Sequence, residues 1–180
     1  MLLLKSTFMA PYMQLATALI GKTREGGGNM FRHQLATMAT LIDYGYIDSV
    51  LLKASIVHDL IEDIPDFNHN LLLQVDFESP LVYDLVMQVT RQPGETKAEF
   101  LTRILEAGSS QAKILKVADR ISNMIDLGFV VDTEFIHRYT EETVRYIFPI
   151  AEQVNKAMLS ELQSLVDSRR KYLLAIIPEK

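Results

Sequence analysis

The sequence predicts an all-α fold in a single domain. Apolar residues recur every three or four positions through most of the chain, which is the spacing of an amphipathic helix. No window shows sustained alternation of apolar and polar residues between turn signals, and the one β-rich patch, 129–131, is too short to build a sheet. A length of 180 residues is that of one domain. We find no repeat or linker that would divide it, and we assign 1–180 to one helical bundle.

Helical spacing, together with the residues that start and stop helices, predicts a bundle of about seven to nine helices. The expected segments are 11–23, 31–44, 48 to about 62, 79 to about 90, 96–106, 109 or 110 to 128, and 133 almost to the end. The glycine-rich stretch 26–29 cannot be the interior of a helix. Residues 66–77 are polar and mixed, so we expect a loop with a short helical turn there.

Single residues indicate where several of these helices begin or break. Asp48 and Thr96 fit N-caps, and a glutamate three residues after Thr96 completes the pattern of a capping box. Ser79 followed by Pro80 fits an N-cap and the first helical position. Pro149 is expected to kink or break the last helical segment, because proline cannot donate the backbone hydrogen bond.

The composition excludes several kinds of chemistry. There is no cysteine, so disulfides, thiolate nucleophiles and iron–sulfur clusters are ruled out, and any metal must be held by His, Asp, Glu or other oxygen groups. Lys and Arg number 18 against 23 Asp and Glu, a net charge of −5, which argues against a nucleic-acid binder because phosphate contacts need a basic face. This balance still allows a local basic pocket for a small phosphorylated ligand.

Targeting signals are not evident in the sequence. No apolar run approaches the length of a membrane-spanning helix, and the first residues lack the form of a signal peptide. We therefore expect a cytoplasmic protein that makes no membrane contact.

Four ionisable residues lie close together in sequence beside an apolar stretch: His58, Asp59, Glu62 and Asp63. On a helix His58 and Asp59 would point about 100° apart and could reach one metal at neighbouring positions, with the two acids one turn later. A solvated helix end is the simpler interpretation of such acids. Burial beside the apolar residues 54–57, however, would be costly without a cation.

Asp119 is a second unusual acid, because it interrupts the strongly apolar segment 114–118. An unpaired carboxylate there would be poorly tolerated, so it needs a cation or several hydrogen-bond donors. Arg120 is an alternative partner, although adjacent residues on a helix do not face each other. His33, which opens the segment 31–44, is by itself more simply a polar residue at a helix start.

The order His33, His58–Asp59, Asp119 resembles the H…HD…D pattern of the HD-domain metal-dependent phosphohydrolases. Within that group, four stretches of sequence resemble motifs of the RelA/SpoT-type (p)ppGpp hydrolase domains, in the same order: 21–24, 54–63, 116–124 and 141–151. The second carries the HDxxED motif and the third the ADRxxN motif, which are the most specific. No synthetase-like segment follows, so the chain resembles a small standalone alarmone hydrolase with the HD fold.

The resemblance implies a metal held by His33, His58, Asp59 and Asp119, and the implied metal is Mn²⁺. Two imidazoles and two carboxylates without sulfur suit that ion. Fe²⁺ and Zn²⁺ also accept such ligands, so the spacing does not choose among the three.

The resemblance also implies roles for residues around the metal. Glu62 and Asp63 match a catalytic acidic pair, which would orient or deprotonate the attacking water and handle leaving-group protons. Arg24 matches a substrate-binding arginine near the phosphates, and Asn123 matches a residue near the nucleotide sugar. Two more cations, Lys22 and Arg32, are further candidates for contacts with phosphate.

Three positions depart from the usual pattern of the family. Leu19 stands in place of a histidine, Glu25 in place of a frequent lysine, and Gln34 in place of a proline after the first metal histidine. None of these changes removes a ligand or a catalytic acid. Glu25 reverses a charge beside the expected phosphate site, so a less charged nucleotide than a tetraphosphate would be repelled less.

We therefore expect a Mn²⁺-dependent phosphohydrolase of a small phosphorylated nucleotide, with pyrophosphate release from the 3′ position of (p)ppGpp as the leading reaction. The nearest alternative is a phosphatase of the same type acting on NADPH or a nucleoside monophosphate. A catalytically silent nucleotide-binding HD protein is an alternative of another class, and the intact pair Glu62 and Asp63 argues against it. A helical interaction protein without a site is a third, and the late helix leaves room for a homo-oligomer face.

Overall fold

The structure, a computed structural model, describes residues 7–24 and 27–176. Within these residues the protein is helical, and the one β-type contact is an isolated antiparallel bridge between Thr23 and Asn29. The predicted all-α class is therefore confirmed.

The helices of the first half are α2 (Ala10–Ala16), the 3-10 turn η1 (Thr17–Leu19), α3 (Met30–Asp43), α4 (Ser49–Val57), α5 (Leu60–Asp63), α6 (His69–Leu73) and α7 (Ser79–Val89). Those of the second half are α8 (Lys97–Ala107), α9 (Ser110–Asp126), the 3-10 turn η2 (Leu127–Phe129), α10 (Thr133–Glu142), the π-helical segment η3 (Thr143–Ile147), α11 (Phe148–Val154) and α12 (Lys156–Ile176). Nine of the α-helices in the described residues have seven or more residues, within the predicted number.

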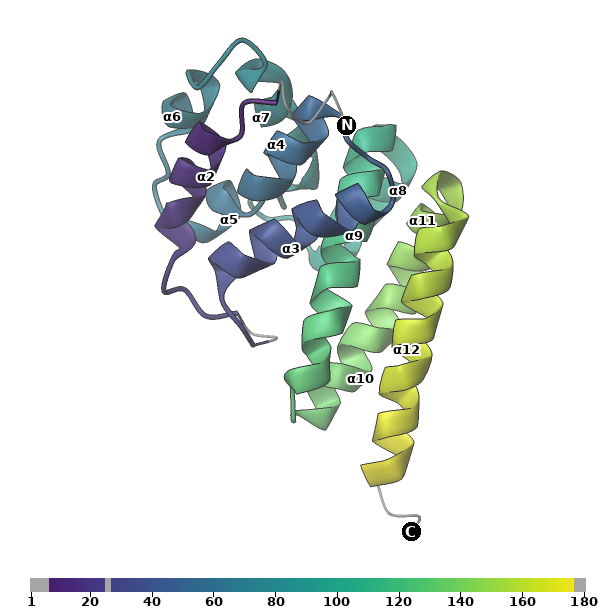
Figure 1. The fold of residues 1–180 in the computed structure, drawn as a ribbon. Coiled ribbons are helices and arrows are strands. Elements are labelled where there is room, and N and C mark those ends of the chain that lie inside the picture. The colour runs from purple at the N-terminus through teal and green to yellow at the C-terminus, as the bar shows by residue number, and fades with distance from the viewer. Residues whose placement is uncertain (1–6, 25–26, 177–180) are drawn as a thin grey trace.

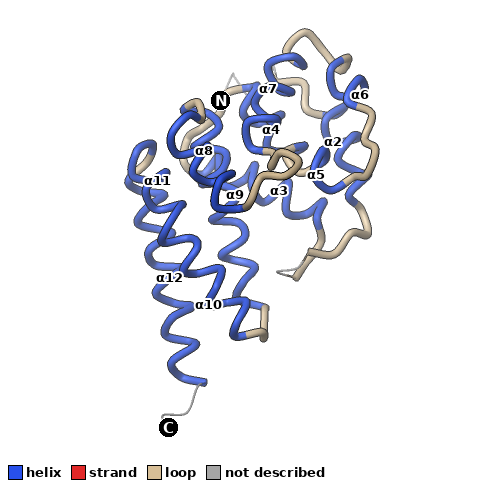
Figure 2. The backbone as a smooth tube through the Cα atoms, turned by 180° about the vertical axis from the view of Figure 1, so that it is seen from behind, coloured by secondary structure: helices blue, strands red, loops and turns tan. Residues whose placement is uncertain are grey.

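Helix α9 is the element that both halves of the fold share. Figure 1 shows the helices α2 to α7 gathered on one side and α10 to α12 on the other, with α9 running between them. Helix α3 packs against α9 and α4, while α11 and α12 pack against the other side of α9. The view from behind in Figure 2 shows α8 lying close to the upper part of α9. Residues of α3, α4 and α9 thus meet at the centre of the molecule.

The core is formed by apolar side chains from nearly every helix. Leu41 of α3, Ile56 of α4, Leu115 of α9 and Ile150 of α11 are fully buried. Burial of each such side chain contributes about 1.5–3 kcal/mol, which fixes the helices that carry the polar residues described below.

The segment 48–62, predicted as one helix, is divided in two. Helix α4 ends at Val57, His58 is its C-cap, and α5 begins again at Leu60. The Nδ1 atom of His58 lies 2.7 Å from the backbone carbonyl of Ser55, so the imidazole satisfies a carbonyl that the helix end leaves unpaired. The break therefore falls at His58 and Asp59, two of the expected metal ligands. There the imidazole of His58 takes the place of the backbone N–H that would continue the helix.

Two other long segments are also shorter than predicted. Helix α2 ends at Ala16, and the chain continues as the turn η1 before Gly21, which adopts φ +84°. The segment from 133 is divided by the π-helix η3 and again at Asn155, whose extended backbone ends α11. The Asn155 side chain then accepts hydrogen bonds from the backbone of Ala157 and Met158, the first turn of α12.

Most of the predicted helix boundaries are confirmed. Asp48 accepts a hydrogen bond from the backbone of Leu51, and Thr96 forms the expected capping box. Pro149 lies in the first turn of α11, two residues after the π-helix, and the backbone stays helical through it, so the predicted disruption takes the form of a π-helical segment and not of a break. The cap of α7 is a correction, because Ser79 is already helical and Glu78 precedes it.

Two further observations complete the fold. The short helical turn predicted within 66–77 is α6. Among the described residues, no helix is both long enough and apolar enough to cross a membrane.

Candidate metal centre

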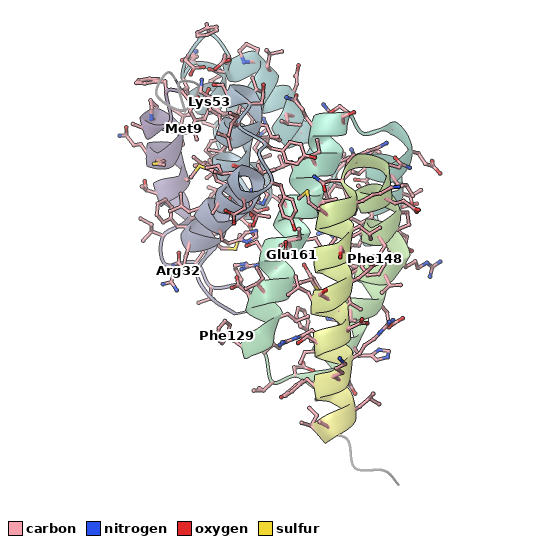
Figure 3. All side chains as sticks on the ribbon, turned by 45° about the vertical axis from the view of Figure 1, so that its right-hand side comes forward. Met9, Arg32, Lys53, Phe129, Phe148 and Glu161 are labelled. Atoms are coloured by element: carbon pink, nitrogen blue, oxygen red, sulfur yellow. The ribbon has the colours of Figure 1, made fainter. Side chains whose placement is uncertain are left out.

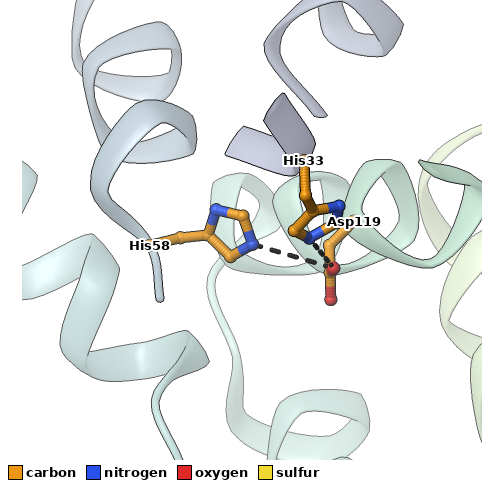
Figure 4. Close-up of side chains that lie close together, drawn as sticks. All are labelled: His33, His58 and Asp119. Atoms are coloured by element: carbon orange, nitrogen blue, oxygen red, sulfur yellow. Dashed lines mark hydrogen bonds and ion pairs between the residues drawn. The ribbon is translucent and has the colours of Figure 1, made fainter. Parts of the chain in front are cut away.

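Three buried side chains from three helices converge at the centre of the fold. His33 comes from the first turns of α3, His58 from the end of α4 and Asp119 from the middle of α9. One ligand atom of each lies within 4.8 Å of the other two, and all three residues are buried. Figure 4 shows the two imidazoles turned toward the carboxylate of Asp119. This is the geometry of a site that can hold a cation.

The hydrogen bonds of His58 leave one ring nitrogen available as a ligand. Because Nδ1 lies 2.7 Å from a backbone carbonyl, which can only accept, Nδ1 carries a hydrogen, and Nε2 is the nitrogen that can bind a cation. Burial alone would lower the pKa of His58, but Asp59 and Asp119 outweigh it and raise the pKa to about 9, so a cation at Nε2 would take the place of a proton. Nε2 is buried and, among the described residues, has no hydrogen-bond partner. It lies 3.3 Å from Oδ2 of Asp59 and 3.7 Å from Oδ1 of Asp119. A buried imidazole nitrogen beside two carboxylates is the donor arrangement that a divalent cation requires.

Asp119 is held as a carboxylate by several donors. Lys116 Nζ lies 2.8 Å from Oδ2, while His33 Nε2 and Asn123 Nδ2 lie 3.0 and 2.6 Å from Oδ1. Burial alone would raise the pKa of Asp119, but Lys116 and the two histidines hold it well below the ordinary value. The sequence predicts that this acid needs a cation or several donors, and the structure supplies a cation, Lys116, together with donors from His33 and Asn123.

His33 has a second partner on α9. Its Nδ1 lies 3.0 Å from the hydroxyl of Ser122, which orients the ring toward Asp119. The two imidazoles are 5.3 Å apart between centroids and meet edge to face. The sequence alone gave only a weak reason to select His33, and the contacts across α3 and α9 supply the stronger one.

Asp59 lies at the edge of the buried triad, between α4 and α5. Its Oδ2 atom is 3.3 Å from His58 Nε2 and 3.6 Å from His33 Nε2, and the side chain is 23% exposed. The amide of Gln34 donates to the same oxygen at 2.8 Å. Asp59 is therefore placed beside the triad on the side that opens to solvent.

A cavity of about 710 Å³ adjoins the triad and carries both predicted catalytic acids. Its walls include Asp59, Glu62, Asp63 and Asp119. The pKa of Asp63 is raised to about 6, first by burial and then by the charges of Asp59 and Glu62. Glu62 is more exposed and lies 3.7 Å from Arg91 at the rim. The three acids of the HDxxED motif and Asp119 of α9 thus line the same cavity.

The predicted substrate-binding residues are separated by the structure. Arg24 and Asn123 line the cavity and are bonded to each other, with the Arg24 guanidinium also donating to Asp126. Lys22 instead donates to the backbone carbonyl of Asp63, outside the cavity wall. Arg32 is exposed on α3 and does not line the cavity (Figure 3). Glu25, whose negative charge makes the number of phosphates on the substrate uncertain from sequence, lies outside the described residues.

Arg120 is an internal ion-pair residue, and its carboxylate partner is Glu142 and not the adjacent Asp119. Its guanidinium is buried, bonds to Glu142 at 2.6 Å and lies 4.1 Å from the ring centroid of Tyr139. The second carboxylate oxygen of Glu142 lies 3.0 Å from Lys97 Nζ at the start of α8. These contacts tie α8 and α10 to α9 on the far wall of the cavity.

The sequence did not single out the residues of that wall. Lys97, Tyr139 and Glu142 line the cavity but belong to helices α8 and α10, which the HDxxED and ADRxxN motifs do not include. Glu142 lies in the stretch 141–151 that resembles the family, yet nothing in the spacing marks its carboxylate as a partner of Arg120. Only the contact across α9 and α10 identifies it.

Comparison with known proteins connects this centre with a class of fold. No family model matches the sequence, and no curated protein matches it either. Among solved structures, the fold is similar to that of a protein described as "A metazoan ortholog of SpoT hydrolyzes ppGpp and plays a role in starvation responses". The two superpose with a TM-score of 0.71 at 20% sequence identity, over 89% of this chain and 94% of that chain. The fold implied by the resemblance to the HD-type (p)ppGpp hydrolases is thereby confirmed.

Proposed function

We propose that this protein is a metal-dependent phosphohydrolase of a small phosphorylated nucleotide. The observation that carries the proposal is the buried nitrogen of His58. It faces Asp59 and Asp119 with no hydrogen-bond partner among the described residues, beside a cavity that holds two further acids. A helical protein without a site would have no reason to bury such a set, because unpaired polar groups are costly in a core.

We infer that the metal is Mn²⁺, held by His33, His58, Asp59 and Asp119. The donor set of imidazole nitrogen and carboxylate oxygen supports this choice, while Fe²⁺ and Zn²⁺ would accept the same ligands. When bound, the cation would polarise a phosphoryl group and lower the pKa of a water molecule. The cluster fits such an ion, since each imidazole is oriented by a second contact, to Ser55 or to Ser122.

Glu62 and Asp63 would manage the protons of the reaction. The raised pKa of Asp63, about 6, lets its carboxyl hold or release a proton near neutral pH. Lys22 bonds to the backbone carbonyl of Asp63 and so fixes the end of α5 on which both acids lie. We propose that one acid removes a proton from the attacking water and that the pair returns one to the leaving group.

The proposed substrate is (p)ppGpp, hydrolysed between the ribose 3′ oxygen and the diphosphate. Cationic side chains from several helices support a polyphosphate, since guanidinium and ammonium groups suit phosphate oxygens. Those that line the cavity are Arg24, Arg91, Lys97, Lys116, Arg120 and Arg138. The hydrolysis of ppGpp described for the neighbouring structure supports the same choice.

A less charged nucleotide, such as NADPH or a nucleoside monophosphate, is a second candidate because much of this positive charge is neutralised within the protein. Arg24 pairs with Asp126, Lys116 with Asp119, and both Lys97 and Arg120 with Glu142. A tetraphosphate would have to compete with those carboxylates.

A screen of phosphate and pyrophosphate release tests the proposal. Metal-stripped protein is reloaded with Mn²⁺, Fe²⁺ or Zn²⁺ and incubated with ppGpp, NADPH or nucleoside monophosphates. Pyrophosphate from ppGpp supports the leading substrate, and phosphate from another nucleotide supports the alternative. Saturable nucleotide binding without release in any arm would indicate a silent sensor instead and would overturn the enzymatic proposal.

A further inference from the structure

Gln34 is a buried polar residue that neither the catalytic acids nor the metal triad explains. It follows His33 on α3, is fully buried, and donates through Nε2 to Oδ2 of Asp59 at 2.8 Å. A carboxylate oxygen can only accept, so the partner itself fixes which end of the Gln34 amide faces it. The contact joins α3 to the break between α4 and α5.

The other end of the same amide is unsatisfied. Within the described residues Oε1 of Gln34 is buried without a hydrogen-bond partner. An unpaired buried acceptor destabilises the folded state, so an apolar residue of similar size would suit the core better. The resembled family usually has a proline after the first metal histidine, and proline has no side-chain donor. The glutamine is thus a feature of this chain that costs stability while it orients one carboxylate.

Each of the other three metal residues is also oriented by a contact outside the centre. His58 bonds to the Ser55 carbonyl, His33 to the Ser122 hydroxyl and Asp119 to the Lys116 ammonium group. Gln34 gives the equivalent support to Asp59, whose partly exposed carboxylate has no other hydrogen-bond donor outside the centre among the described residues. Such outer contacts fix the ligand orientation and strengthen metal binding.

We propose that Gln34 is a positioning residue that holds the carboxylate of Asp59 toward the two imidazoles as the fourth ligand of the metal centre. This inference rests on the metal site of the proposed function. It adds that the fourth ligand depends on a neutral amide from α3.

The test compares Gln34→Met with Thr37→Val in metal-stripped protein titrated with Mn²⁺ by calorimetry. Methionine keeps the volume and removes the donor, so we expect the Kd for Mn²⁺ to rise about 10- to 100-fold. The Tm in EDTA should stay the same or rise, because the unpaired acceptor is gone. Thr37 is the matched control, since it lies one turn later on α3, is fully buried, and its hydroxyl has no partner in the described structure. Its variant should bind Mn²⁺ as the wild type does.

A double-mutant cycle separates positioning from a general effect on the fold. In an Asp59→Ala background the change Gln34→Met should have no further effect on the Kd, because the group through which Gln34 acts is absent. An unchanged Kd in Gln34→Met alone, or an equal loss in both backgrounds, would overturn the inference. Failure of the wild type to bind Mn²⁺ saturably would overturn the proposed metal site itself, which is a different result. If Gln34→Met unfolds, Gln34→Leu serves in the same comparison.

Discussion

The guanidinium of Arg24 is bonded to the carboxylate of Asp126, although 102 positions of sequence separate the two residues. The Arg24 side chain is 8% exposed in this pair, against 33% for Asp126. The same guanidinium also donates to the side-chain oxygen of Asn123. Arg24 and Asn123, two of the four residues that the resemblance implies for the substrate, are therefore bonded to each other, and Arg24 is also bonded to an acid that no motif identified.

Asp126→Asn should strengthen the binding of a phosphorylated nucleotide. The acid neutralises Arg24 and repels phosphate, and a partly exposed ion pair of this kind contributes about 0.2–1 kcal/mol. Its removal should lower KM by about two- to fivefold, most clearly at low ionic strength. Steady-state kinetics with the nucleotide found in the release screen provide the measurement. Asp84→Asn, the same charge change on an exposed residue of α7, should leave KM unchanged. A higher KM in Asp126→Asn would mean that the acid supports Arg24 instead of competing for it.

Asp119→Ala should abolish both metal binding and activity. The carboxylate contacts His33 and is 3.7 Å from His58 Nε2. Its removal takes away the one carboxylate of the buried triad. The alanine also leaves the Lys116 ammonium without its partner, which costs about 3–5 kcal/mol when a buried pair is broken. Asp119→Asn keeps the side-chain volume and an oxygen that can accept from Lys116, and it should still lose the metal. Thermal unfolding with and without Mn²⁺ checks this, because adding Mn²⁺ should not raise the Tm of either variant.

The exposed acid Asp167 on α12 provides the control for that experiment. Asp167→Asn should keep the full Mn²⁺-dependent rise in Tm. Full activity in Asp119→Asn would defeat the assignment of Asp119 as a ligand.

Glu62→Gln should retain the metal and lose turnover by at least about a hundredfold, the scale of lost acid–base catalysis. Glu62 lines the cavity, and within the described part of the chain its side chain bonds to Arg91 at an exposed position, so the change should affect the fold little. The measurement is kcat beside the Kd for Mn²⁺, with Glu106→Gln on the surface of α8 as the control. An unchanged kcat would remove Glu62 from the catalytic pair.

The sequence was informative where local patterns determine local structure. The cap at Asp48, the capping box at Thr96 and the apolar face of α9 depend on residues a few positions apart, and the structure contains all three. The order of the proposed metal ligands is also predictable from the sequence, because short motifs carry it. The geometry that joins them is not, since it depends on how α3, α4 and α9 pack.

Other features needed contacts between distant residues. The apolar spacing continues through 57–60, so nothing in it indicates that His58 ends α4. The partners Asp126 of Arg24 and Glu142 of Arg120 are brought near by tertiary packing alone. Lys53 is the clearest case, because it lies in an apolar helix and its partner Asp76 belongs to the segment 66–77, predicted as a loop.

Lys53 is a fully buried cation between two carboxylates. Its Nζ lies 2.7 Å from Asp76 and also bonds to Glu78, while Tyr12 donates to Asp76 at 2.9 Å. Burial alone would raise the pKa of Asp76, but the bonds from Lys53 and Tyr12 hold it below the ordinary value, and bonds from Lys53 and Ser49 do the same for Glu78. This network joins α2 and α4 to the start of α7.

Lys53→Met should lower the free energy of unfolding at pH 7 by about 3–5 kcal/mol, because it leaves two partly buried carboxylates without their cation. The difference in free energy of unfolding between the variant and the wild type should become smaller as the pH falls. A depressed folded-state pKa contributes stability that is present above the unfolded value, near 4, and is lost as the pH falls through the folded value. Urea unfolding between pH 7 and about pH 3 measures both effects. Lys171→Met on exposed α12 should stay within about 0.5 kcal/mol of the wild type throughout. A difference for Lys53→Met that stays constant or grows at low pH would show that the lysine stabilises the fold by packing and not by its charge.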